Sequence, residues 1–73
     1  LGDFAKALLY FQKTHELNPS NATVHFKIAE IYSKSAKTED YTKAATSIEQ
    51  AINLDSKNSY FYLLASTIYT QLN

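Results

Sequence analysis

The sequence predicts an all-α protein in which four antiparallel helices form a solenoid of repeated helical hairpins. Three observations predict this fold. The 73 residues include one glycine and one proline, too few turn-forming residues for a protein of many short strands. Apolar residues recur at steps of three and four, which is the spacing of one face of an α-helix. The chain also repeats itself at an offset of 37 residues.

The repeat is clearest at the start of two expected helices. Residues 3–7, Asp-Phe-Ala-Lys-Ala, return as Asp-Tyr-Thr-Lys-Ala at residues 40–44. At the same offset, the matched positions are Leu17 with Leu54, Ser20 with Lys57, Asn21 with Asn58, His25 with Tyr62, Ile28 with Ala65, Ala29 with Ser66, and Tyr32 with Tyr69. Because the register holds over this whole span, the repeating unit is longer than a single helix.

The first helix is expected near residues 3–18 and the third near 40–54, since each has an apolar stripe with helical spacing. The stripe of the first helix comprises Phe4, Ala7, Leu8, Phe11, Thr14 and Leu17, and that of the third comprises Tyr41, Ala44, Ile48, Ala51 and Leu54. A shorter stripe, His25, Ile28, Ala29 and Tyr32, predicts the second helix near 22–36. The fourth helix is expected near 59–72.

The ends of these helices coincide with residues that favour such positions. The carboxylates of Asp3 and Asp40 can accept hydrogen bonds from free amides at a helix start, where the helix dipole also favours negative charge. Residues 18–21, Asn-Pro-Ser-Asn, are expected to stop the first helix and cap the second, because proline cannot continue a helix. Residues 55–59 are expected to do the same between the third and fourth helices.

The expected fourth helix is apolar on nearly every side. One apolar side comprises Tyr62, Ala65 and Tyr69, and a second comprises Phe61, Leu64 and Ile68. A helix of this kind needs cover from several directions, so we expect a following helix or a partner protein to supply it. Made alone, the 73 residues are expected to be partly unfolded or to self-associate. The chain has no methionine, and we interpret it as a fragment of a longer array.

Charge and composition narrow the function classes. Seven lysines balance seven acidic residues, and the chain has neither arginine nor cysteine. The absence of cysteine excludes disulfides and thiolate metal sites. Neutral charge without arginine argues against nucleic-acid binding, which normally uses a basic face. The longest apolar run, residues 60–65, is about a third of a membrane span, so this segment is not expected to insert into a membrane.

The first helix carries a residue pattern that is found in a known family. Gly2, Asp3 and Phe4, followed by Ala7, Phe11, Leu17 and Pro19, resemble the second helix of a tetratricopeptide repeat. In that family the glycine makes a turn, the alanine allows close approach of helices, the aromatic residue fills the gap and the proline ends the unit. The resemblance extends over the whole chain and implies a superhelix of antiparallel helical hairpins.

The resemblance divides the chain into three parts. Residues 1–21 would be the second helix of a first repeat, residues 22–58 a complete repeat, and residues 59–73 the first helix of a third. The complete repeat has 37 residues against about 34 in the family, and the extra residues fall at 37–40, between its helices. It also departs from the family at Ser56 in place of the closing proline, Thr14 in place of alanine, and His25 in place of tryptophan.

The resemblance also implies candidate partner-binding residues, because the first helix of each repeat lines the inner groove of such arrays. The groove positions here are Thr23, Phe26, Glu30, Ser33 and Lys34 in the complete repeat, and Tyr60, Leu63, Thr67, Thr70 and Gln71 in the helix that follows. The family's clamp for a peptide carboxylate uses lysine, arginine and asparagine, whereas Phe26, Glu30, Leu63 and Thr67 stand at those places. We therefore expect no carboxylate-clamp binding. Alternatively, further repeats of the same chain cover the apolar groove residues.

No catalytic, cofactor-binding or metal-binding site is expected. His15 and His25 have no serine, cysteine or carboxylate at a spacing that is typical of a nucleophile and its base. His15 is expected on the outward, solvated side of its helix, and His25 is expected to be a packing residue. The chain has no glycine-rich phosphate loop. These observations predict a protein that is not an enzyme.

The leading hypothesis is a non-catalytic scaffold that binds a protein or peptide partner within a larger complex. One alternative is a helical-repeat RNA-binding protein, similar to the pentatricopeptide repeats, in which other repeats carry the basic charge. A second alternative is a regulatory repeat domain attached to an enzyme elsewhere in the chain. Family analogy points to a bacterial envelope or secretion assembly, and a cytoplasmic location fits equally well.

Overall fold

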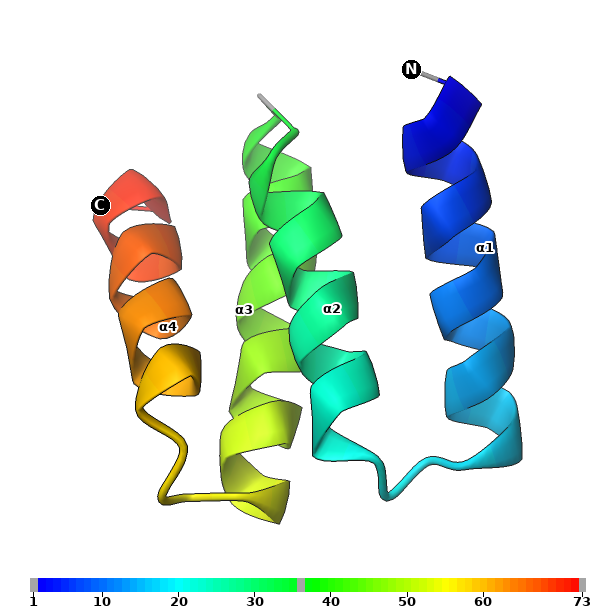
Figure 1. Ribbon diagram of the computed structural model, residues 1–73. Coiled ribbons are helices and arrows are strands. Elements are labelled where there is room, and N and C mark those ends of the chain that lie inside the picture. The colour runs from blue at the N-terminus through cyan, green and yellow to red at the C-terminus, as the bar shows by residue number, and fades with distance from the viewer. Residues whose placement is uncertain (1, 36, 73) are drawn as a thin grey trace.

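Four α-helices, each antiparallel to the one before it, make up the computed structural model, which describes residues 2–35 and 37–72 (Figure 1). They are α1 (Gly2–Leu17), α2 (Ala22–Ser33), α3 (Thr38–Leu54) and α4 (Ser59–Leu72). No strand occurs within the described ranges. The predicted all-α class and the number of helices are therefore confirmed for this part of the chain.

The turn between α1 and α2 follows the predicted chemistry. Asn18 donates its backbone N–H to the Thr14 carbonyl at 2.8 Å, and Pro19 follows where the helix has ended. Asn21 then caps α2, because its side-chain oxygen accepts from the amides of Thr23 at 3.0 Å and Val24 at 3.3 Å. The expected roles of residues 18–21 are confirmed.

The connection between α2 and α3 differs from the prediction at both ends. Helix α2 ends at Ser33 rather than near residue 36. At this end the Lys34 amide donates to the Ile31 carbonyl at 3.2 Å and tightens the last turn. Helix α3 begins at Thr38, with Lys37 as its N-cap and no side-chain cap. Asp40 therefore lies inside the first turn, so the prediction that it caps the helix is wrong, although its charge still suits the helix dipole.

The side chains of Asp3 and Phe4 lie outside the described part of the molecule, as does the turn expected from Gly2.

The turn before α4 again uses asparagine. The Asn58 side chain accepts from the Tyr60 amide at 3.0 Å, as predicted for residues 55–59.

The core is centred on α3, which lies between α2 and α4 (Figure 1). Ala44, Ile48 and Ala51 of α3 are fully buried. Alanines at these positions let the flanking helices approach α3 closely, and Ile48 fills the space between them. The buried residues around them are Val24, Ile28 and Ala29 of α2, Ala45 of α3, and Phe61, Ala65 and Ile68 of α4. By contrast, α1 neighbours α2 alone among the described helices.

Several hydrogen bonds recur at the 37-residue offset of the sequence repeat. The Gln12 amide of α1 donates to the Tyr32 hydroxyl of α2 at 3.3 Å. At the corresponding positions, the Tyr69 hydroxyl of α4 donates to the Glu49 carboxylate of α3. The contact between α1 and α2 is thus of the same kind as the contact between α3 and α4.

The turns carry a second recurring pair. His25 Nε2 donates to the Pro19 carbonyl at 3.0 Å, and the Tyr62 hydroxyl donates to the Ser56 carbonyl at 2.8 Å. Although His25 in one repeat corresponds to Tyr62 in the other, each side chain bonds its helix to a backbone carbonyl of the preceding turn.

None of the described helices is long and apolar enough to cross a membrane.

Candidate functional site

The groove residues that the sequence predicts lie on two neighbouring helices. Thr23, Phe26 and Glu30 follow each other at three- and four-residue steps and so share one side of α2, and Lys34, its C-cap residue, follows four residues later. Tyr60, Leu63 and Thr67 share one side of α4 in the same way. We call these seven residues the groove set. Since α2 and α4 are close to each other in space, the structure brings the two halves of the set onto adjacent helices.

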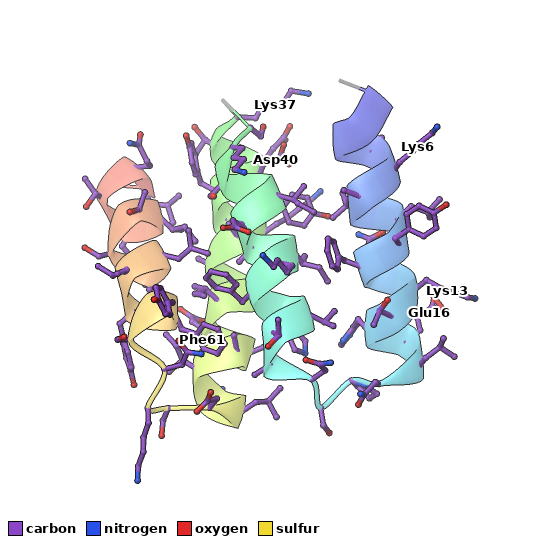
Figure 2. The ribbon with its side chains drawn as sticks, in the orientation of Figure 1. Lys6, Lys13, Glu16, Lys37, Asp40 and Phe61 are labelled. Atoms are coloured by element: carbon purple, nitrogen blue, oxygen red, sulfur yellow. The ribbon has the colours of Figure 1, made fainter. Side chains whose placement is uncertain are left out.

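An aromatic stack joins α2 and α4, and one of its two rings, Phe26, belongs to the groove set. The rings of Phe26 and Phe61 are stacked with centroids 5.1 Å apart and planes at 27°. Phe61 is buried and lies between α4 and the other helices, as Figure 2 shows. Phe26 is half-buried, so its inner side packs on the core and its outer side contributes to the surface.

Two of the four polar members of the groove set, Glu30 and Thr67, make side-chain contacts on their own helices. Glu30 forms an ion pair with Lys27. The Lys27 Nζ atom lies 3.6 Å from the Glu30 carboxylate and 5.7 Å from the centre of the Phe26 ring. The Thr67 hydroxyl donates to the Leu63 carbonyl at 3.2 Å. Thr23 and Lys34 are exposed. These contacts arrange a mixed surface of one ion pair and several short polar groups around the aromatic stack.

The apolar members on α4 are open to solvent. Tyr60 is 70% exposed and Leu63 is 65% exposed, although a large apolar side chain normally gains free energy from burial. With the half-buried Phe26 of α2, they are the apolar members of the groove set. Large exposed apolar side chains are common on surfaces that bind other molecules.

A second feature, which we call the histidine cleft, lies among α1, α2 and α3 and encloses about 610 Å³. The rings of His15 and His25 meet edge to face there, with centroids 4.6 Å apart. His15 is therefore half-buried and its Nδ1 atom is fully buried, so the prediction that it is solvated is wrong. The prediction that His25 is a packing residue is confirmed, because it is buried.

The lining of the histidine cleft mixes apolar and polar groups and holds no assembled catalytic group among the described residues. Its residues are Gln12, His15, Pro19, His25, Ile28, Tyr32, Lys43, Thr46, Ser47 and Gln50. His25 bonds to a backbone carbonyl, and His15 Nδ1 has no hydrogen-bond partner among the described residues. Neither imidazole is thus oriented by a carboxylate or paired with a hydroxyl nucleophile in this part of the chain. Within the described ranges, no three histidine or carboxylate side chains are grouped as metal ligands.

The cleft and the groove set occupy opposite sides of α2. The cleft uses His25, Ile28 and Tyr32, whereas the groove set uses Thr23, Phe26 and Glu30. At 3.6 residues per turn, these two sets of positions point in roughly opposite directions. The molecule therefore presents two separate surfaces.

Tyr62 and Tyr69 of α4 form a third surface. They are 48% and 39% exposed, and they belong to the apolar side for which a following helix or a partner protein is expected to supply cover. Phe61, Ala65 and Ile68 form the buried side against the core. The hydrogen bond from Tyr69 to Glu49 raises the pKa of the Tyr69 hydroxyl above its usual value, with smaller contributions from burial and from the charge of the carboxylate.

Comparisons with known proteins add no assignment to these three surfaces. No protein-family model, no curated protein and no solved structure matches the chain.

Proposed function

We propose that this chain is a non-catalytic segment of helical-hairpin repeats, similar to tetratricopeptide repeats, that binds an extended protein segment along the groove set. The observation that carries the proposal is the exposure of Tyr60 and Leu63 beside the stacked Phe26 on neighbouring helices. Aromatic and aliphatic side chains in a row supply contact area for a partner, and the surrounding threonines and the Lys27–Glu30 pair supply a polar rim.

The repeat character of the fold supports this proposal. The bonds Gln12–Tyr32 and Glu49–Tyr69 recur at one offset, as do the bonds that tie His25 and Tyr62 to the preceding turns. In a stacked array, equivalent helices lie side by side and create an extended binding surface. The positions of α2 and α4 agree with such stacking.

The test is selection of binding peptides from a random library with the immobilised chain, followed by measurement of their affinities. The double variant Tyr60→Ser/Leu63→Ser should bind the selected peptides roughly thirtyfold more weakly, since two anchors that each contribute about 1 kcal/mol lose about 2 kcal/mol together. The matched control is Leu9→Ser/Leu17→Ser, which removes two exposed leucines from α1 and should bind as the parent does.

Unchanged affinity in the groove variant, or equal loss in the control, would contradict the proposal. A parallel titration with labelled single-stranded RNA tests the alternative class. Tight binding that weakens steeply with added salt would favour nucleic-acid binding instead.

A further inference from the structure

Apart from the small contact of α2 with α4, the described helices meet in two kinds of contact, and one of these occurs only once. The contact of α1 with α2 corresponds to that of α3 with α4 at the sequence offset. Each has one hydrogen bond at the matching positions, between Gln12 and Tyr32 in the first and between Glu49 and Tyr69 in the second. The contact of α2 with α3 has no such counterpart. The helix side that α2 contributes to this contact is nevertheless repeated on the outer side of α4, and the side that α3 contributes is repeated on the outer side of α1.

The outer side of α4 corresponds to the side of α2 that packs on α3. Ala29 is fully buried there, and Tyr32 packs against the same core. Their counterparts are Ser66 and Tyr69, which are exposed, as is the neighbouring Tyr62. We call Tyr62, Ser66 and Tyr69 the α4 end face. It has no counterpart of α3 packed on it within residues 2–35 and 37–72.

The outer side of α1 corresponds to the side of α3 that packs on α2. Ala44, Ile48 and Ala51 are fully buried in α3, whereas their counterparts Ala7, Phe11 and Thr14 in α1 are half-buried or exposed. We call Ala7, Phe11 and Thr14 the α1 end face. Helices α1 and α4 lie at opposite ends of the row of helices (Figure 1) and do not contact each other, so the two end faces do not meet within one chain.

We propose that copies of this chain associate head to tail, with the α1 end face of one copy packed on the α4 end face of the next. A second copy is suited to cover the α4 end face because α1 repeats the packing pattern that α3 presents to α2. This pattern is a small residue, a large apolar residue and a second small residue. The α4 helix contains no charged residue, and neither do the three α1 positions, so the contact buries no charge.

A cation also recurs at the matching place. Lys43 Nζ of α3 lies 5.6 Å from the centre of the Tyr32 ring of α2. Lys6 is the counterpart of Lys43, and Figure 2 shows it projecting from the side of α1 that faces away from α2. In the head-to-tail contact, Lys6 of one copy approaches Tyr69 of the other in the same arrangement.

The two end faces differ from each other, so the association is heterologous and does not close into a symmetric dimer. Each added copy leaves one α4 end face and one α1 end face open. The average mass should therefore rise continuously above 8.3 kDa as the concentration increases from micromolar to millimolar.

Sedimentation velocity on two complementary variants tests the contact. Ser66→Glu puts a charge where the counterpart Ala29 is fully buried, and Thr14→Glu does so at the counterpart of Ala51. Both native residues are exposed in the single chain, so each variant should keep the helical circular dichroism of the parent. Each variant alone should be monomeric. An equal mixture should form a dimer and nothing larger, because one intact end face remains on each partner.

Thr67→Glu is the matched control. Thr67 lies next to Ser66 but on the groove side, where its counterpart is already Glu30, so this variant should associate as the parent does. Three results would overturn the proposal: a parent that stays monomeric at millimolar concentration, a mixture that fails to form the dimer, or a loss of association in Thr67→Glu but not in Ser66→Glu. The last result would place the self-contact on the groove set.

Discussion

At the scale of single residues, two interhelical hydrogen bonds at equivalent positions of the repeat use different donors and acceptors. Gln12 donates to the Tyr32 hydroxyl between α1 and α2, whereas the Tyr69 hydroxyl donates to the Glu49 carboxylate between α4 and α3. The amide is neutral at every pH, but the carboxylate is an anion that favours the protonated tyrosine. The two contacts should therefore respond differently to alkaline pH.

The first prediction is that the α3–α4 contact weakens at alkaline pH. Because the pKa of Tyr69 is raised above its ordinary value of about 10, chiefly by its bond to Glu49, the protonated hydroxyl stabilises the fold. This contribution is fully present below the unfolded pKa and is lost as the pH rises through the raised pKa of the folded state. Tyrosinate absorbance, compared between the parent and Tyr69→Phe, reports the titration of Tyr69.

Glu49→Gln supplies the control for this titration. It keeps a hydrogen-bonding side chain, as Gln12 does in the other contact, and removes the negative charge. The pKa of Tyr69 should fall toward the ordinary tyrosine value in this variant. Identical titrations of the parent and Glu49→Gln would rule out the carboxylate as the cause.

His15 shows where single-residue prediction failed. Its helix face lies at the margin of the apolar stripe, and an isolated helical wheel assigns such a margin to solvent. The structure covers it with His25, which comes from the next helix. A usable signal was present in the sequence, since the repeat counterpart of His15 is Ile52, an apolar residue.

At the scale of helices, the number and most bounds of the elements could be predicted, because long stripes and strong turn residues mark them. Pro19 and Asn21 define one turn, and Asn58 defines another. Residues 34–37 contain neither glycine nor proline, so the pattern gave no reason to end α2 at Ser33 or to begin α3 at Thr38. There, backbone bonds of the final turn decided the boundary.

The second prediction concerns the close approach of helices at Ala44, which is fully buried in α3. Replacing Ala44 with leucine adds volume where no space remains, and should lower the free energy of unfolding by about 1–3 kcal/mol. Urea denaturation followed by circular dichroism measures the change. Ala5→Leu is the control, because Ala5 is exposed on α1 and leucine has nearly the same helix propensity as alanine. Equal stability of Ala44→Leu and the parent would refute the packing role.

At the scale of the whole molecule, the sequence pattern predicted which residues share a helix side but not which helices meet. The groove set falls on one side of α2 and one side of α4 because helical periodicity determines those sides. The stack of Phe26 on Phe61 depends on the angle between helices that are separated in the sequence, and no local pattern encodes that angle.

The unequal burial of the helices leads to the third prediction, which concerns local stability. Helix α3 has Ala44, Ala45, Ile48 and Ala51 buried between its neighbours, whereas none of the described side chains of α1, residues 5–17, is buried. A helix that is held on one side by half-buried groups opens more often than one that is packed on two sides.

Native-state hydrogen exchange should therefore show the slowest amide exchange in α3 and the fastest in α1, with α4 between them. The measurement is best made on Ser66→Glu at low concentration, where no second copy can protect α1. Deleting residues 1–20 provides the control: the remaining helices should stay folded, since α1 contacts α2 alone and contributes no fully buried side chain from residues 5–17. If the amides of α1 exchange as slowly as those of α3, or if the truncated chain loses its helical circular dichroism, then α1 is part of the cooperative core and burial does not set the order of opening.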